Sequence, residues 1–476
     1  MYLTQTDIAN ARVNKGRILT DTELLVDLIK KDRDSQIKIN MRDGVKYYEG
    51  DHDILRHSFQ KYWVNGEEYE DNNKSNNRLV HTLHKLMVDQ KAGYIAKNPV
   101  TMVVSNDEDA IVEQMGTTFH DKLNDWIVGA SNMGVDYVHP YYNEKGDFKT
   151  TIISAIELIP IYDTNYEAEI VEMIRYYKIQ VIVNGETQDR TRVEWWDEKE
   201  VTFYIETDQG LYIKEPVEKN EQGDEEGSNP RGHWITQNSA SNLQTDKSWG
   251  KVPFVPLYNN SKQLTDLQPI KTLIDDYDFN VSDASNNLAD LQEAIWVLSG
   301  YEGEELAEFQ QNLKKYKAIN VSEDGSVAPQ TLDIPVIARD SLLERHLSDV
   351  FMYGMGVDMS RDAFNNSPSG VSLKFLFTLL DTKARTMERK LQTSLQELMW
   401  FIITSLGKDP EKIEVTFTFD YSMLVNEAEI VDSLSKSEIP PEDYFKKHPF
   451  VSDVDEAVKW KAKQVEEFIP LDDNVT

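Results

Sequence analysis

Apolar residues recur at helical spacing along the first hundred residues of the chain. Residues 5–40 follow this pattern, and Thr20 to Glu23 (TDTE) forms a capping box before LLVDLIKK. A second amphipathic run covers 78–96 and is followed by Pro99, and the residue before a proline disfavours the helical conformation. The pattern therefore predicts N-terminal helices, one of which ends near Gly50.

The periodicity changes to alternation between about 101 and 212. Segments such as TMVVS, ELIPIYD, VEWWD and EVTFYIET alternate apolar and polar residues and are separated by Gly, Asn and Asp. This pattern predicts an antiparallel sheet, with a helix over about 112–133 packed on it. Residues 216–248 are polar, acidic and glycine-containing, so we expect a flexible loop there.

Helical spacing returns after residue 253 and dominates the rest of the chain. Helices are predicted over 264–291 and 337–358, and a third from 371 to about 406 would be roughly 50 Å long. Between the first two helices, an insertion at 292–336 is predicted to contain the strands AIWVLSG, KAINVS and QTLDIPV and a helix at 304–316. The remaining predicted elements are a polar loop at 359–370, a strand at 413–419 and a helical segment at 426–468. The fold class is therefore α+β.

The charge balance adds a constraint that the hydrophobic pattern does not. Among 476 residues there are 83 acidic and 50 basic side chains, a formal net charge of −33. A protein that grips DNA neutralises phosphates with Lys and Arg, so this composition argues against a DNA-gripping surface. The absence of cysteine excludes disulfides, thiolate metal sites and a cysteine nucleophile.

No targeting or membrane segment is predicted. The N-terminus MYLTQTDIAN lacks a basic region followed by an apolar core, so we expect no secretory signal. The longest apolar run, Leu398 to Ile403, is far shorter than the ~20 residues that cross a bilayer.

The residues that could carry catalysis or bind metal are few. Asp51, His52 and Asp53 could form a metal site or an acid–base pair. Adjacent residues do not converge on one ion, so we favour a solvated helix end, and we interpret His81 and His84 as ordinary helix residues. There is no phosphate-binding G-x-x-x-x-G-K-[ST] loop and no G-x-S-x-G nucleophile motif. We expect no catalytic residue, no metal and no cofactor.

Several sequence blocks, taken in order, resemble one known family. They are YYEGDHDIL (47–55), SNNRLVHTLHKLMVDQKAGYIAKNPV (75–100), ELIPIYD (157–163), VEWWD (193–197), GKVPFVPLYNN (250–260), LTDLQPIKTLIDDYD (264–278), the block 295–327 and SGVSLKFLFTLLDTKARTMERKLQ (369–392). No single block is a catalytic fingerprint, but together they span nearly all of the chain. The chain resembles the portal proteins of tailed bacteriophages, of the type found in siphophages of Gram-positive bacteria.

This resemblance implies a division of the chain into regions. They are a wing at 1–263, stem helices at 264–291 and 337–358, a clip at 292–336, a tunnel loop at 359–370, a spar helix and strand at 371–424, and a crown at 425–476. It also implies a twelve-subunit ring at the portal vertex of the virion capsid, assembled in the host cytoplasm. The implied partners are double-stranded DNA without sequence specificity, terminase, scaffold protein, major capsid protein and head–tail connector proteins; no membrane is involved.

On this resemblance, three groups of residues would form functional sites. The tunnel loop would face DNA through Ser360, Arg361, Asp362, Asn365, Asn366 and Ser367, making weak phosphate contacts without base readout. Gly354 and Gly356 would let a stem helix bend. The clip would dock partners through Glu304, Glu305, Glu308, Lys314 and Lys315.

The acidic composition is consistent with a DNA conduit. A channel through which DNA slides should not offer continuous phosphate neutralisation, because each released counterion adds affinity. An acidic wall instead repels DNA over about one Debye length, ~8–10 Å. Two alternatives remain from the residues alone: an acidic interaction scaffold without DNA, and a metal-dependent nuclease or hydrolase.

Overall fold

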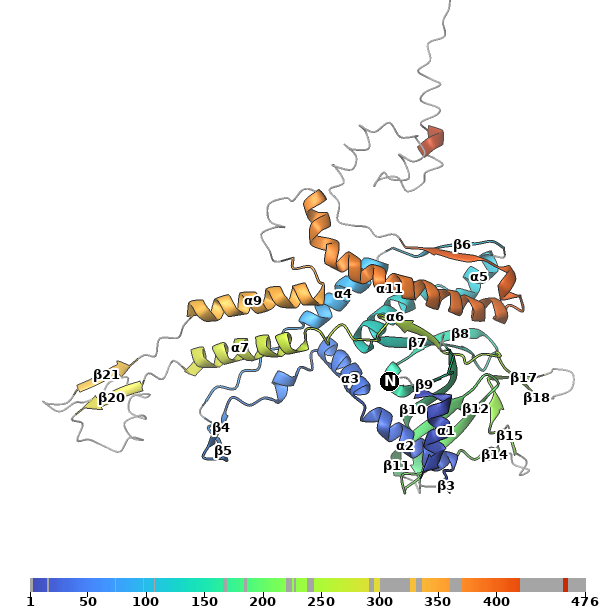
Figure 1. Ribbon diagram of the computed structural model, residues 1–476, viewed down its shortest axis with the longest axis horizontal. Helices are drawn as coiled ribbons and strands as arrows, with labels where there is room; N and C mark the ends of the chain where they lie inside the picture. Colours follow the sequence, from blue (N-terminus) through green and yellow to red (C-terminus); the bar gives the residue numbers. More distant parts are fainter. Residues whose placement is uncertain are drawn as a thin grey trace, which may run out of the picture. The chain divides into compact units, whose positions relative to one another are not determined.

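The structure is a computed structural model in which the described chain forms two compact units. It describes residues 3–14, 17–72, 74–96, 98–106, 108–165, 169–183, 186–219, 225–226, 228–237, 244–290, 295–299, 326–330, 336–359, 370–419 and 457–460. Unit 1 comprises Met1–Arg42, Met87–Asp266 and Met355–Thr476, and unit 2 comprises Asp43–Leu86 and Leu267–Gly354. Figure 1 shows the elements of both units. Each unit is considered separately.

The larger sheet of unit 1 is largely antiparallel, as the alternating pattern predicts. Its strand order is β1-β9-β10-β11-β12-β13, with β16 beside β12, and only β1 and β9 run parallel. The strands are β1 (Leu3–Thr4), β9 (Leu158–Tyr162), β10 (Ile170–Val183), β11 (Glu186–Trp196), β12 (Glu200–Glu206), β13 (Tyr212–Lys214) and β16 (Arg231–Gly232). Helices α1 (Gln5–Arg12) and α2 (Asp21–Arg33) bury Ile8, Leu24, Leu25 and Leu28 against this sheet.

A second sheet of unit 1 packs on helices. Its order is β19-β7-β8, from β19 (Val255–Tyr258), β7 (Val135–Tyr142) and β8 (Phe148–Ile153). Helices α6 (Phe119–Met133) and α11 (Gly370–Ser405) share one core with this sheet. The residues of α11 that face this core are buried and recur every three or four positions: Leu380, Ala384, Met387, Leu391, Leu395, Leu398 and Ile402.

A buried ion cluster lies within the helical core of unit 1. Lys91 Nζ donates to Asp266 Oδ2 (2.6 Å) and to Asn259 Oδ1 (2.7 Å), and Lys383 Nζ lies 3.2 Å from the same carboxylate oxygen. Burial lowers the pKa of Lys91 to about 8, against the attraction of Asp266. Burial also opposes ionisation of Asp266, but the two lysines hold its pKa well below the usual range. The cluster links α4 (Leu83–Ala96), α11 and the chain that leads into α7.

Unit 2 is built around two helices. They are α7 (Lys271–Asp290) and α9 (Val336–Gly354), which lie side by side in Figure 1. The unit also contains the end of α3 (Gln36–Glu49), the short helix η1 (Asp53–Arg56), and the hairpins β4 (Lys61–Val64)/β5 (Glu67–Glu70) and β20 (Ile295–Ser299)/β21 (Ser326–Gln330). The long helices expected over 264–291, 337–358 and 371–406 are present as α7, α9 and α11, but α7 begins seven residues later and α9 ends four residues earlier than expected.

Several predicted elements differ in detail. The run 5–40 contains α1, α2 and the start of α3, and the two-stranded pair β2 (Val13–Asn14) and β3 (Arg17–Ile18) interrupts it. The helix expected over 112–133 is two helices, α5 (Glu108–Met115) and α6, separated at Gly116, which has φ +79°. Helix α4 begins at Leu83, five residues later than expected, because 75–81 lies extended along α7. The helix at 304–316, the strand KAINVS and most of 426–468 lie outside the described residues.

The remaining strands form small pairs. The strand expected at 413–419 is β22 (Val415–Thr418), which pairs with β6 (Thr101–Val104). The region 216–248 contributes β14 (Glu218–Lys219), β15 (Glu225–Glu226), β17 (Trp234–Gln237) and β18 (Gln244–Lys247). Thus the described part of that region contains paired strands where only a loop was expected. The short helices η2 (Ala155–Glu157) and η3 (Pro410–Lys412) complete the described elements.

Gly134, which ends α6, gives a test of close packing in unit 1. It adopts φ +82°, and a Cβ there would lie 2.1 Å from the carbonyl oxygen of Gln263. Gly146 has φ +80° with nothing within 4 Å of its Cβ position.

We predict that Gly146→Ala lowers the free energy of unfolding by about 1 kcal/mol, through backbone strain alone. Gly134→Ala should cost roughly 2–4 kcal/mol because overpacking is added to the strain. Thermal or urea unfolding measures both, and equal losses would contradict the packing argument.

Candidate functional site: the helix pair 271–290 and 336–354

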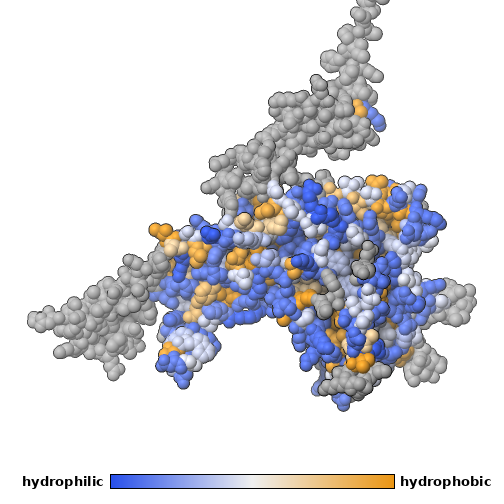
Figure 2. All heavy atoms as spheres, viewed as in Figure 1, coloured by the Kyte–Doolittle hydropathy of each residue, from blue (hydrophilic) through white to orange (hydrophobic). Residues whose placement is uncertain are grey.

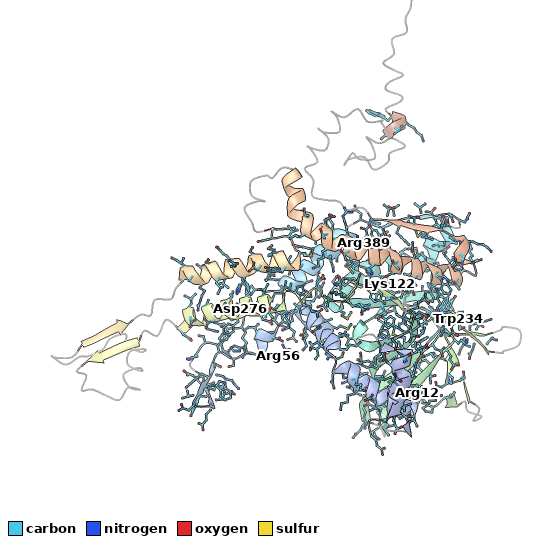
Figure 3. All side chains as sticks on the ribbon, viewed as in Figure 1. Arg12, Arg56, Lys122, Trp234, Asp276 and Arg389 are labelled. Atoms are coloured by element: carbon cyan, nitrogen blue, oxygen red, sulfur yellow. The ribbon has the colours of Figure 1, made fainter. Side chains whose placement is uncertain are left out.

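The two helices of unit 2 are held together by polar as well as apolar contacts. Arg339 of α9 donates to Asp283 of α7 at 2.7 Å, and His346 Nδ1 lies 3.2 Å from Asp276 Oδ2. Asp276 is marked on α7 in Figure 3. Val350 and Phe351 of α9 and Ile274 of α7 are buried. The pair is therefore a defined two-helix element.

An extended segment binds along α7 through a ladder of hydrogen bonds. Every second backbone N–H between residues 75 and 81 donates to every fourth side chain of α7. The four bonds are Ser75 N to Asp290 Oδ1 (2.9 Å), Asn77 N to Asn286 Oδ1 (2.6 Å), Leu79 N to Ser282 Oγ (2.9 Å) and His81 N to Asp278 Oδ1 (3.0 Å). The segment therefore runs antiparallel to the helix.

The ladder works because the two repeats have nearly the same length. Two residues of extended chain advance about 6.7 Å, and four residues of α-helix advance about 6.0 Å. The acceptors Asp278, Ser282 and Asn286 are all buried, so each satisfies a backbone donor that would otherwise be costly to desolvate. The signal is present in the sequence as four polar residues spaced four apart, but their acceptor role depends on the partner segment.

Asp278 is the centre of this ladder. Its Oδ2 lies 2.6 Å from His52 Nδ1, and its Oδ1 lies 2.8 Å from His81 Nδ1. Burial opposes ionisation of Asp278, but the hydrogen bonds from His52 and His81 hold its pKa below the usual value. His52 is fully buried and stacks on the Tyr47 ring, with a centroid distance of 4.3 Å.

The prediction of a solvated helix end at Asp51–Asp53 is therefore wrong for its central residue. Asp51 pairs with Arg56 at 2.6 Å, and Asp53 pairs with Lys271 of α7 at 2.6 Å, while His52 turns inward. Arg56 is marked in Figure 3. The three side chains do not converge, and among the described residues no group of three His, Asp or Glu side chains is arranged to hold a metal ion.

A second network ties the same segment to the start of α7. Lys271 Nζ donates to the Tyr47 hydroxyl (3.0 Å) as well as to Asp53 and Asp275. Partial burial opposes charging of Lys271, yet the hydrogen bonds to these partners raise its pKa above the usual value. Tyr47 in turn donates to Asp275. Together, these contacts fix residues 47–53 and 75–81 on one side of α7.

The remaining surface of the helix pair is acidic and apolar. Outside the ladder and the Lys271 network, α7 carries Asp276 and Asp283 and no lysine or arginine. Large apolar side chains are also exposed on the two helices: Leu288 of α7 and Ile337, Met352 and Tyr353 of α9 are each at least 58% exposed. Figure 2 shows apolar patches among polar ones over this pair. Such a surface is suited to packing against protein, with an acidic rather than a phosphate-binding character.

The sequence-predicted site residues are only partly within the described structure. Gly354 ends α9, and Gly356 follows in unit 1, where a Cβ would lie 2.7 Å from Met87 Cγ. Val357 is held by the Gln90 amide through two hydrogen bonds of 2.8 and 2.9 Å. All six tunnel-loop residues between 360 and 367, and the five predicted docking residues between 304 and 315, lie outside the described residues. The structure therefore leaves their roles as predictions.

Replacing Asp278 tests the ladder. We predict that Asp278→Asn lowers the free energy of unfolding by roughly 2–3 kcal/mol, because an amide has only one acceptor oxygen and one of the two histidines is left without an acceptor in a buried site. The control Asp276→Asn, on the same helix but with a side chain 53% exposed, should cost less than about 1 kcal/mol. Chemical denaturation measures both.

The stability lost in Asp278→Asn, relative to the native protein, should depend on pH. Folding lowers the pKa of Asp278. The contribution of the ionised carboxylate to stability is therefore fully present above the pKa of the unfolded chain, ~3.9, and is lost as the pH falls through the pKa of the folded state. The stability difference between the native protein and Asp278→Asn should therefore shrink below about pH 4. A difference that grows on acidification would contradict this assignment.

Comparison with known proteins shows the family to which the chain belongs. The family model described as "Phage portal protein, SPP1 Gp6-like" matches residues 27–468. The portal protein of Bacillus phage SPP1 is 32% identical over 444 residues, covering 91% of this chain and 85% of that protein. The portal protein of Clostridium phage phiCD119 is 30% identical over 434 residues, covering 87% of this chain and 90% of that protein.

A solved structure also aligns with the chain. It is described as the neck of a native GTA particle computed with C12 symmetry, with a TM-score of 0.41 and 9% identity, covering 76% of this chain and 88% of the other. In the described part of this chain, no helix is both long and apolar enough to span a membrane. On the strength of the family model and the two curated relatives, the chain belongs to the family of SPP1 Gp6-like phage portal proteins.

Proposed function

We propose that this protein is a non-catalytic ring subunit through whose central channel double-stranded DNA passes. The observation that carries the proposal is the acidic helix pair α7/α9, which the ladder and the Lys271 network hold as one element. A channel wall must keep its shape while DNA moves, so its helices need fixed supports on the side away from DNA. Helix α7 has these supports along most of its length.

The charge of the helix pair supports sliding rather than gripping. Helix α9 adds Asp340, Glu344 and Asp349 to Asp276 and Asp283, the two aspartates of α7 outside the ladder and the Lys271 network, against Arg339 and Arg345. A DNA-binding wall would present unpaired cations, and Arg339 is already paired with Asp283. An acidic wall repels phosphate over a Debye length of ~8–10 Å, which would keep the duplex centred.

We propose region-specific roles for the rest of the chain. The loop at 359–370 would contact DNA backbone, and the insertion at 292–336 would dock the packaging motor (terminase) and later the head–tail connector proteins. The segment 425–476 would form a crown inside the capsid, while scaffold and major capsid protein would contact the wing, 1–263. The ring would comprise twelve copies at the portal vertex of the virion, assembled in the host cytoplasm.

Imaging tests the ring directly. The purified chain is expected to form closed rings with a central opening in negative-stain images. The exposed apolar side chains of α7 and α9 supply buried area between copies, and added salt should favour rings by screening the acidic charge. A protein that remains monomeric at all concentrations and salt conditions would exclude the ring.

Substitution of the loop tests the DNA path. Replacing Asn365, Asn366 and Ser367 with lysines should slow or stall DNA packaging without preventing ring formation, because added cations bind phosphate. Packaging measured as nuclease-protected DNA per particle is the readout, with alanine replacements at the same positions as the control. Unchanged packaging by the lysine variant would contradict the placement of this loop beside DNA.

A further inference from the structure

The hairpin β4/β5 of unit 2 exposes every one of its residues. Tyr62, Trp63, Val64 and Tyr69 are 43%, 69%, 44% and 44% exposed, and all eight strand residues are exposed to solvent. The hairpin is closed by Asn65-Gly66, both with positive φ, a pair that favours a tight two-residue turn. Figures 1 and 2 show it extending away from α7 as a small separate lobe.

Such a hairpin has little to stabilise it in water. An isolated two-stranded hairpin is marginally stable, and its two open edges can pair with other chains. Its base is fixed: Phe59 stacks on Phe279 of α7, and Phe59 N donates to Asn76 Oδ1 at 3.1 Å. Its tip, which carries Trp63, has no such contact among the described residues. A positioned base and an exposed aromatic tip are the features of an arm that binds another surface.

The chemistry of the arm restricts what it can bind. Glu67, Glu68 and Glu70 flank the aromatic side chains, and Lys61 is paired with Glu68. The arm is therefore acidic, which disfavours DNA and other acidic surfaces. Its partner surface should combine positive charge with apolar area. It should also present exposed backbone groups that can hydrogen-bond to the unpaired backbone groups at the edge of the hairpin.

One segment of this same chain has those properties. Residues 72–88 contain no Asp or Glu, although acidic residues make up 83 of the 476 in the chain, and they carry three cations. Lys74 Nζ lies 5.3 Å from the Tyr62 ring centroid and Lys85 Nζ lies 4.3 Å from the Tyr48 ring centroid of the same copy, which leaves Arg78 as the third cation. Arg78 is exposed and, within the described chain, forms no ion pair; it donates to backbone and amide oxygens of Leu55 and Asn76. Leu79 is 38% exposed beside it.

The side of this segment away from α7 meets the base of the hairpin in the same copy at its start, where the Lys74 carbonyl accepts from Gln60 Nε2 at 2.8 Å. The amides of residues 75, 77, 79 and 81 point to α7, and successive residues of an extended chain point their backbone groups to opposite sides. The N–H and C=O groups of 76, 78 and 80 therefore face away from α7. The segment 74–80 thus offers backbone groups, a cation and an apolar side chain together.

We propose that the hairpin 61–70 of one copy docks on the segment 74–80 of a second copy of this chain. Arm and acceptor are different surfaces of one molecule, so the contact is head-to-tail and can repeat around a closed ring. The inference rests on the ring of the proposed function and specifies one of its contacts. Trp63 is the apolar anchor, and the arm's glutamates face Arg78.

Cross-linking tests which surface the arm meets. The chain has no cysteine, so Glu68→Cys gives one attachment point for a thiol-linked benzophenone. In rings assembled from isotope-labelled and unlabelled copies, photolysis should join residue 68 to a peptide from 74–85 of the other copy, as shown by mass spectrometry. Ile182→Cys, on the tip of the β10/β11 hairpin and at a position 79% exposed, is the control and should not label that peptide. Links confined to one copy, or to another surface, would overturn the proposal.

A matched pair of substitutions tests the energetics. Trp63→Ser should raise the protein concentration needed for half-assembly by about tenfold or more, as for an aromatic anchor at an interface. Ile182→Ser should leave it unchanged, and both variants should keep the unfolding midpoint of the parent. Rings that form equally well with Trp63→Ser would overturn the arm contact while leaving the ring intact. If the parent forms no oligomer, the proposed function itself fails.

Discussion

The fit between an extended chain and a helix is the constraint on which unit 2 depends. Four backbone amides between residues 75 and 81 find acceptors on Asp278, Ser282, Asn286 and Asp290 because two residues of strand and four of helix have nearly equal length. The ladder delays the start of α4 to Leu83 and covers one face of α7. It also sets which backbone groups of 76, 78 and 80 remain available.

Two buried carboxylates, one in each unit, are surrounded by partners. In unit 2, Asp278 accepts from two histidines and a backbone amide; in unit 1, Asp266 is shared by Lys91 and Lys383. Removing one partner from such a group is costly, because it leaves the other charge buried. These groups are therefore best understood as supports that fix elements in place, in a protein whose family role is structural.

The overall acidity has different consequences at different places. On the α7/α9 pair it accompanies paired cations, so this surface offers little neutralisation to phosphate. On the β4/β5 arm it accompanies aromatic side chains, and the acid-free segment 72–88 is the complementary surface within the same chain. A net charge of −33 describes neither local pattern.

The sequence by itself determined the α+β class, the three long helices and the family resemblance. Periodicity is a local property, and segments such as Leu380 to Ile402 repeat their buried residues in strict helical order. The capping box at Thr20 was likewise correctly predicted, since both of its hydrogen bonds join residues three apart.

Only the tertiary structure decided the roles of polar residues whose partners are distant in the sequence. His52 is a polar residue between two aspartates, and it is buried because Asp278, 226 positions away, accepts its hydrogen bond. Gly134 and Gly356 are constrained by atoms of Gln263 and Met87 that no local pattern specifies. Likewise, nothing local distinguishes Ser282 or Asn286 from a solvated helix face. Their function as acceptors exists only because a distant extended segment has the matching repeat.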